Sequence, residues 1–187
     1  MRKNNQGFSL IELIVVIAIM AVMIGVTGFS LAFLFGADAR QAAAKIGAQL
    51  NETKTGSMSR YDESMTLAYR TKDTAKGIPS DGYYAENRTW TIENTDQLVK
   101  EDEDTIFREV GSSRVNITIY YDGGKSLVLG DTHSVTISYN RTSGAMDKTV
   151  IDGSTVAPVT LESMVVSSAS KEYTITFIPE TGKHMIR

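Results

Sequence analysis

Residues 7–35 read GFSLIELIVVIAIMAVMIGVTGFSLAFLF, and this stretch decides the fold. Glu12 is its only charged residue. A helix needs about 20 mostly apolar residues to cross a bilayer, so we expect residues 8–36 to span a membrane. Arg2 and Lys3 precede the run and favour a cytoplasmic N-terminus, which places the rest of the chain outside the cytoplasm.

Three interpretations of this run compete. A secretory signal peptide would use a small-residue cleavage site, and residues 37–39 and 42–44 have that composition. However, the apolar region of a signal peptide covers only about 7–15 residues, roughly half of what is present. A plain single-pass anchor fits the length, but it gives no reason for Glu12. An ionisable group inside a membrane segment costs about 2.5–3.5 kcal/mol at the centre on insertion scales and less near an edge, and by default it suggests a function.

The third interpretation rests on the segment Gly7–Leu13, GFSLIEL. It resembles the prepilin cleavage and methylation motif of type IV pilins and type II secretion pseudopilins. The resemblance implies that prepilin peptidase cuts after Gly7 and releases residues 1–7 as a leader. It also implies that Phe8 becomes the N-methylated terminus, and that Glu12 is the glutamate that acts in assembly.

The residues suit this chemistry. Glycine before the scissile bond gives a protease access to the backbone. Cleavage would remove Arg2 and Lys3, which changes the net charge of the side chains from −3 to −3 − 2 = −5. In the family, the carboxylate corresponding to Glu12 is thought to pair with the N-terminal amine of a neighbouring subunit, which offsets the desolvation of both charges. The competing possibility is that Glu12 caps its own helix or extends to the membrane interface.

The helical pattern continues beyond the apolar run. Over residues 37–58, small and apolar residues recur with a spacing of three or four, and they define one buried face: Ala39, Ala43, Ile46 and Leu50. Gly56 and Ser57 are predicted to stop this helix. Gly25 and Gly28 predict either a bend or close packing of membrane helices.

From about residue 60 the period changes to that of strands. The predicted strands are Ser64–Thr71, Tyr83–Ile92, Thr105–Val110, Val115–Tyr121, Ser134–Asn140 and Tyr173–Ile178, separated by the glycine turns 122–124, 143–144, 152–153 and 181–182. The fold class is therefore α+β: a long N-terminal helix with a membrane-spanning first half, and a C-terminal antiparallel β-sheet domain packed on its second half. The boundaries are residues 1–7 for the leader, 8–36 for the transmembrane or filament-core helix, 37–58 for its exposed half and 59–187 for the β domain.

The C-terminal segment Tyr173–Gly182, YTITFIPETG, resembles the last hairpin of minor pseudopilins of the H type. This implies a minor or initiating subunit rather than the major one.

Other residues offer little chemistry. The chain has no cysteine, which excludes disulfides and thiolate metal sites. The acidic cluster at residues 101–104 is read as a solvated loop rather than a calcium site, because it lacks spaced ligands. His133 and His184 have no evident partner, so no enzyme, metal or cofactor is expected. Trp90, Tyr83 and Tyr84 are expected to fill the core face of the sheet. The net charge of −3 gives no indication of nucleic-acid binding.

The sequence therefore favours a structural subunit of a type IV pilus-like, competence or type II secretion filament. Its partners would be prepilin peptidase, other pilin-like subunits, inner-membrane assembly machinery and, before assembly, the lipid bilayer. It would begin as a single-pass protein of the cytoplasmic membrane with an extracytoplasmic C-terminal domain, and end in an extracellular or periplasmic filament. The alternative is a membrane-anchored binding or adhesion module.

Overall fold

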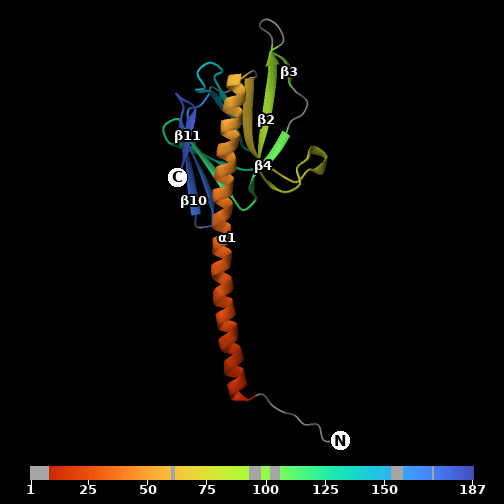
Figure 1. Ribbon diagram of the computed structural model, residues 1–187, viewed down its shortest axis with the longest axis vertical. Coiled ribbons are helices and arrows are strands. Elements are labelled where there is room, and N and C mark those ends of the chain that lie inside the picture. The colour runs from red at the N-terminus through yellow and green to blue at the C-terminus, as the bar shows by residue number, and fades with distance from the viewer. Residues whose placement is uncertain (1–8, 60–61, 93–97, 102–105, 153–157, 170) are drawn as a thin grey trace. The chain divides into compact units, whose positions relative to one another are not determined.

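The computed structural model describes residues 9–59, 62–92, 98–101, 106–152, 158–169 and 171–187 (Figure 1). For residues 26–36, 62, 89–92, 98–101 and 106 it describes the backbone only. The predicted leader, Gly7 and Phe8 lie outside the described residues. In the described part, the elements in chain order are α1 (Leu10–Ser59), β1 (Asp62–Arg70), the 3-10 helix η1 (Thr74–Lys76), β2 (Gly82–Ile92), β3 (Leu98–Glu101), β4 (Ile106–Ser112), β5 (Asn116–Tyr121), β6 (Lys125–Leu129), β7 (Ser134–Tyr139), β8 (Met146–Ile151), β9 (Leu161–Ser168), β10 (Lys171–Ile178) and β11 (Lys183–Ile186).

The helix α1 is continuous from Leu10 to Ser59. Its sequence contains no proline, so no backbone donor is missing from the helical ladder. The helix continues through Gly25 and Gly28, where either a bend or close packing of membrane helices was expected. It also passes the predicted stop at Gly56, because the hydroxyl of the buried Ser57 donates to the carbonyl of Glu63 and holds the last turn in place.

The chain divides into two compact units, Met1–Leu34 and Phe35–Arg187. In the first unit the large apolar side chains between Leu10 and Ile24 are exposed on every face of the helix, with exposed fractions from 47% to 79%. Within the described residues, no helix meets the combined requirements of length and hydropathy for crossing a membrane.

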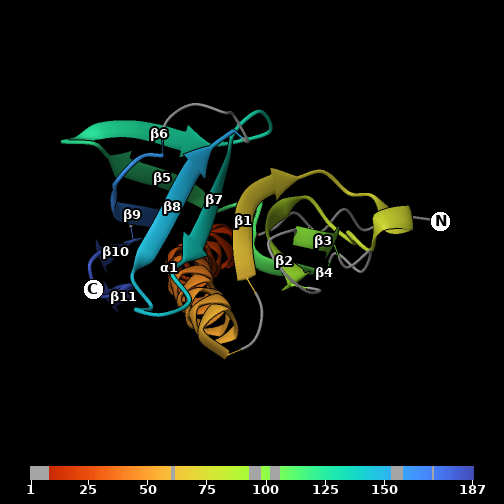
Figure 2. The ribbon, with the colours of Figure 1, turned by 90° about the horizontal axis from the view of Figure 1, so that it is seen from above.

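In the second unit the strands form two antiparallel sheets rather than the single sheet that we expected. The six-stranded sheet has the order β3-β2-β1-β7-β8, with β4 also paired to β2. The five-stranded sheet has the order β11-β10-β9-β5-β6. Seen from above, the C-terminal half of α1 has β1 and β2 on one side and β10 and β11 on the other (Figure 2).

The core lies where one face of α1 meets the inner faces of both sheets. The predicted helical stripe is confirmed, because Ala39, Ala43, Ile46 and Leu50 are all 0% exposed. The sheets contribute buried side chains at alternate positions of their strands, including Met65, Leu67, Val135 and Ile137 from one sheet and Ile117, Ile119, Met164, Val166 and Ile175 from the other. This burial confirms the α+β class with a helix packed on antiparallel strands, a pilin-like arrangement.

All six predicted strands are present and overlap β1, β2, β4, β5, β7 and β10. The described part of the chain has five further strands that were not predicted: β3, β6, β8, β9 and β11. β3 and β11 have only four residues each, which is too short to display a period of two. β9 and β8 carry serine, lysine and aspartate among their apolar residues, so their alternation is weaker in the sequence than in the structure.

Tyr83 and Tyr84 were both expected on the core face of the sheet, but they are buried on opposite faces of it. Tyr83 faces the helix and donates its hydroxyl proton to the carbonyl of Leu129 over 2.8 Å. Tyr84, its neighbour on β2, points to the opposite face, because adjacent side chains alternate across a strand. It is buried there, and its hydroxyl donates to the carbonyl of Ser80. The side chain of Trp90 lies outside the described residues.

Candidate functional site

The candidate site is the first turn of α1, where Ser9 and Glu12 cap the helix reciprocally. The backbone N–H of Ser9 donates to Glu12 Oε2 over 2.9 Å. The backbone N–H of Glu12 donates to Ser9 Oγ over 3.3 Å. A serine followed three residues later by a glutamate is the sequence signature of this capping box. Capping of its own helix was the competing possibility for Glu12, and the geometry shows that Glu12 does cap it.

The local sequence explains why the helix begins here. The first four N–H groups of a helix have no carbonyl partner within the helix, so side chains near its start must satisfy them. Ser9 satisfies one of these groups, and its own carbonyl accepts from the N–H of Leu13 over 3.3 Å, the first bond of the helical ladder. The negative carboxylate of Glu12 also lies at the positive end of the helix dipole.

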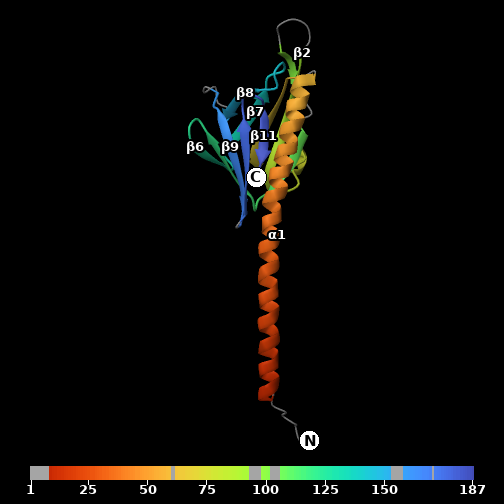
Figure 3. The same ribbon diagram turned by 60° about the vertical axis from the view of Figure 1, so that its left-hand side comes forward.

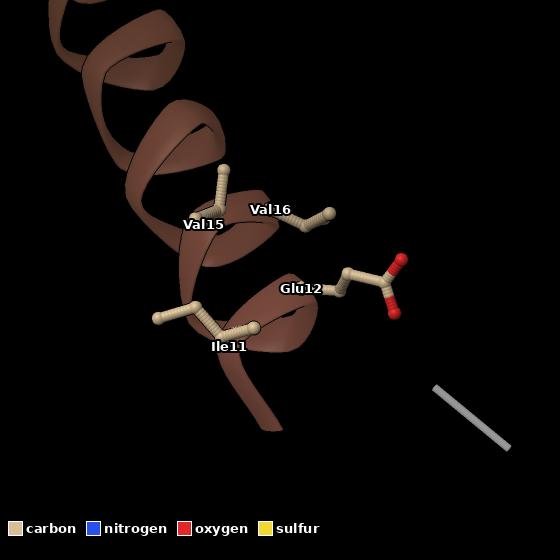
Figure 4. Close-up of a pocket in the computed structure, with 4 residues that line it drawn as sticks. All are labelled: Ile11, Glu12, Val15 and Val16. Carbon is tan, nitrogen blue, oxygen red and sulfur yellow. The ribbon is translucent and has the colours of Figure 1, made fainter. Parts of the chain in front are cut away.

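The surroundings of Glu12 are apolar. A shallow pocket of about 310 Å³ runs along the first two turns and is lined by Ile11, Glu12, Val15 and Val16. Figure 4 shows the Glu12 side chain extending away from the helix axis, beside the side chain of Val16. The arrangement therefore presents one carboxylate on an otherwise apolar, exposed surface, where a cation would be the complementary partner.

Of the predicted site residues, only Glu12 is described. Gly7 and Phe8 lie outside the described residues, as do positions 102–104 of the acidic cluster. The cap shows that Ser9 belongs to the same turn, a role that the sequence analysis missed although the S-x-x-E spacing could have revealed it. Among the residues that the structure describes, no group of three or more histidine, cysteine, aspartate or glutamate side chains is arranged to hold a metal ion.

Both histidines have neighbours that the sequence did not indicate. His133 Nδ1 lies 2.7 Å from Asp152 Oδ2, because the pairing of β7 with β8 brings together residues 19 positions apart. His184, on β11, packs against α1 near Gly47. Neither arrangement includes a nucleophile in the described contacts, so neither forms a catalytic constellation.

A second group of polar contacts joins α1 to the six-stranded sheet. Arg108 on β4 forms an ion pair with Glu52 on α1. The amide nitrogen of Gln49 donates to the same carboxylate over 3.1 Å. Burial raises the pKa of nearby Glu63, the charge of Glu52 raises it further, and Arg108 opposes both effects. These contacts hold the end of the helix against the sheet.

Comparison with known proteins identifies the N-terminal segment. Residues 2–28 match the prokaryotic N-terminal methylation motif, which covers the predicted cleavage site, Phe8 and the capped turn at Glu12. No curated protein and no solved structure is significantly similar to the chain. The chain therefore carries the prepilin methylation motif at the start of a pilin-like α+β fold. The motif implies an N-terminal membrane anchor before assembly.

Proposed function

We propose that this chain is a structural subunit of a type IV pilus-like, type II secretion or competence filament. In this proposal, prepilin peptidase cuts after Gly7 and Phe8 becomes the methylated N-terminus. The observation that carries the proposal is the methylation motif over residues 2–28, which leads into a helix with apolar side chains exposed on every face. Pilin family proteins are structural rather than enzymatic, which agrees with the expectation from sequence.

The exposed surface of α1 supports this function physically. A helix that is apolar on all sides is stable only within a membrane or inside an assembly. Removing apolar surface from water is favourable by about 25 cal/mol per Å², so the helix is stable either in lipid or packed against the helices of neighbouring subunits. Residues 8–36 would hold the chain in the cytoplasmic membrane, with residues 37–187 on the far side, until the assembly machinery extracts it.

The Ser9–Glu12 cap is compatible with a role of Glu12 in assembly. Ser9 uses one oxygen of the carboxylate, and an ionised carboxylate has about four acceptor positions. The ammonium group that cleavage creates at Phe8 of a second copy can occupy the remaining positions. Such a pair would offset the cost of placing both charges in the apolar interior of a filament.

Two finer assignments rest on the sequence alone. The resemblance of Tyr173–Gly182 to the last hairpin of H-type pseudopilins supports a minor or initiating subunit. In the structure this segment forms most of β10 and the turn that leads into β11. The final location would be an extracellular or periplasmic filament.

The intact mass and N-terminal sequence of the protein, purified from native membranes with active prepilin peptidase, test the processing step. We expect the chain to begin at Phe8 with one added methyl group. A chain that still begins at Met1 would contradict the proposal and would favour a membrane-anchored binding module instead.

Replacing Glu12 tests the assembly step separately. We expect Glu12→Ala to be cleaved as the wild type is, but to accumulate in the membrane fraction rather than in sheared filaments, because the ammonium of its neighbour has no partner. Quantitative immunoblotting of both fractions measures this. Glu172→Ala, which removes an exposed carboxylate on β10, is the matched control and should assemble normally. Normal incorporation of Glu12→Ala would refute the assigned role.

A further inference from the structure

The C-terminal hairpin is formed by β10 and β11, and β11 lies beside the C-terminal half of α1 (Figure 3). The hairpin contacts the helix at two places. The first is a notch at Gly47. A methyl group at this position would lie 2.9 Å from Ile186 Cδ1 and 3.1 Å from His184 Nε2. Glycine therefore lets the side chains of Ile186 and His184 approach the helix, and a larger residue would require these side chains to shift.

The second contact lies two turns further along the helix. Lys54 Nζ donates a hydrogen bond over 2.7 Å to the carbonyl of Thr181, in the turn between β10 and β11. The same lysine acts electrostatically on His184. The hairpin thus contacts α1 through β11 and through the turn that precedes β11. Lys54 bonds to the turn and also acts on His184 of β11.

The charge state of His184 matters at this position. The residue is partly buried, and its neighbours Gly47, Ile186 and the opposed Phe177 on β10 are uncharged. The charged group that α1 directs at it is Lys54. A proton on His184 would therefore lose hydration and face a like charge, without a carboxylate among these neighbours to compensate.

We propose that His184 is a pH-sensitive latch for the C-terminal hairpin. As a neutral imidazole it packs in the notch at Gly47, and when protonated it is repelled by Lys54 and releases β11 from α1. β11 is an edge strand of only four residues, so its release would not require the rest of the five-stranded sheet to open. The latch lies within Phe35–Arg187 and operates whether or not the chain enters a filament.

The direction of the pH dependence follows from the contacts. Burial, and then the charge of Lys54, lower the pKa of His184 below its ordinary value of 6.5. The docked state thus binds fewer protons than the released state. Docking is strongest above pH 6.5 and weakens as the pH falls below that value. Each pH unit by which docking lowers the pKa of His184 corresponds to a change of about tenfold in the ratio of docked to released hairpin between high and low pH.

Hydrogen exchange of the full-length protein in detergent micelles, read by mass spectrometry at pH 8 and pH 5, tests the latch. Labelling times are scaled for the intrinsic pH dependence of amide exchange. We expect peptides from residues 179–187, which cover the turn and β11, to lose protection several-fold at pH 5, while peptides from β5 and β9 keep theirs. His184→Gln, which cannot be protonated, should stay docked at both pH values. His133→Gln, which removes the other histidine, should behave as the wild type does.

A titration followed by NMR gives a second readout that does not depend on any His184 variant folding. The imidazole of His184 should titrate below pH 6.5 in the wild type, and its midpoint should rise in Lys54→Met. Equal midpoints in the two proteins would overturn the proposal. So would a wild-type hairpin with unchanged protection at pH 5, or a pH response that persists in His184→Gln.

Discussion

Gly56 and Glu63 illustrate how single residues adjust the end of α1. A methyl group at Gly56 would collide with the carboxylate of Glu63, so the glycine makes room for this side chain. From the sequence, Gly56 was expected to stop the helix, as glycine after an apolar stripe usually does. Its role in the structure is steric, and the helix continues to Ser59.

The raised pKa of Glu63 predicts how stability depends on pH at this position. Burial, reinforced by Glu52, raises its pKa above 4.5, so the folded state favours the protonated carboxyl group. The resulting stabilisation is present below pH 4.5 and is lost as the pH rises through the folded-state value. Glu63→Gln, which mimics the protonated form, should therefore raise Tm at pH 7 and leave it nearly unchanged at pH 4.

Differential scanning calorimetry at both pH values checks this prediction. Glu172→Gln, which neutralises an exposed carboxylate on β10, is the control and should leave Tm nearly unchanged at both pH values. An equal rise at pH 4 and pH 7 for Glu63→Gln would mean that ionisation of Glu63 is not the cause.

Among the elements, α1 links the two sheets through its C-terminal half. Its buried stripe touches side chains of both sheets, and Ala42 approaches Gly111 of β4 so closely that a methyl group on that glycine would lie 3.3 Å from it. The two sheets also meet directly, where the N–H of Met146 on β8 donates to the carbonyl of Pro179 after β10. The helix and this turn together hold the two sheets around one core.

Truncation within the stripe should show this dependence. Leu50 is 0% exposed, and we expect Leu50→Ala to lower the free energy of unfolding by about 2–5 kcal/mol through lost apolar contacts and a residual cavity. Lys45→Ala, at an exposed position on the same helix, should change it by less than about 0.5 kcal/mol. Urea unfolding of the full chain in mild detergent, followed by tyrosine fluorescence, measures both. A loss below about 1 kcal/mol for Leu50→Ala would show that the helix adds little to the core.

For the molecule as a whole, two classes of exposed apolar side chain must be distinguished. Ile17 on α1 is 58% exposed and Val128 on β6 is 57% exposed. Isolated apolar residues are ordinary on protein surfaces, so Val128 needs no partner. Ile17 belongs to a continuous apolar surface that surrounds the helix, and such a surface indicates burial in lipid or in other subunits.

Matched substitutions at these two positions test the proposed membrane role of the first unit. A lysine at the centre of a membrane helix costs about 2.5–3.5 kcal/mol, so Ile17→Lys should shift the protein out of the membrane fraction. Val128→Lys, at a similarly exposed position, should leave the distribution unchanged. Carbonate extraction followed by immunoblotting distinguishes the outcomes. Equal behaviour of the two variants would contradict membrane insertion through this segment.

The sequence by itself determined the features that depend on near neighbours. Helical spacing identified the buried face at Ile46 and Leu50, alternation identified six strands, and residues 7–13 identified the methylation motif, because each pattern lies within a few residues. The Ser9–Glu12 cap was equally local, yet it was recognised only from its hydrogen bonds.

Only the tertiary structure decided which segments meet. β5 pairs with β9, so that Asn116 lies opposite Ser167 across 51 positions of sequence, and this divides the strands into two sheets. The same long-range pairing places His133 beside Asp152 and His184 against α1. A strand presents similar edges to many possible partners, and its alternation specifies a buried face but not a neighbour. The choice of neighbour is made by the packing of the whole core around α1, which no short stretch of sequence contains.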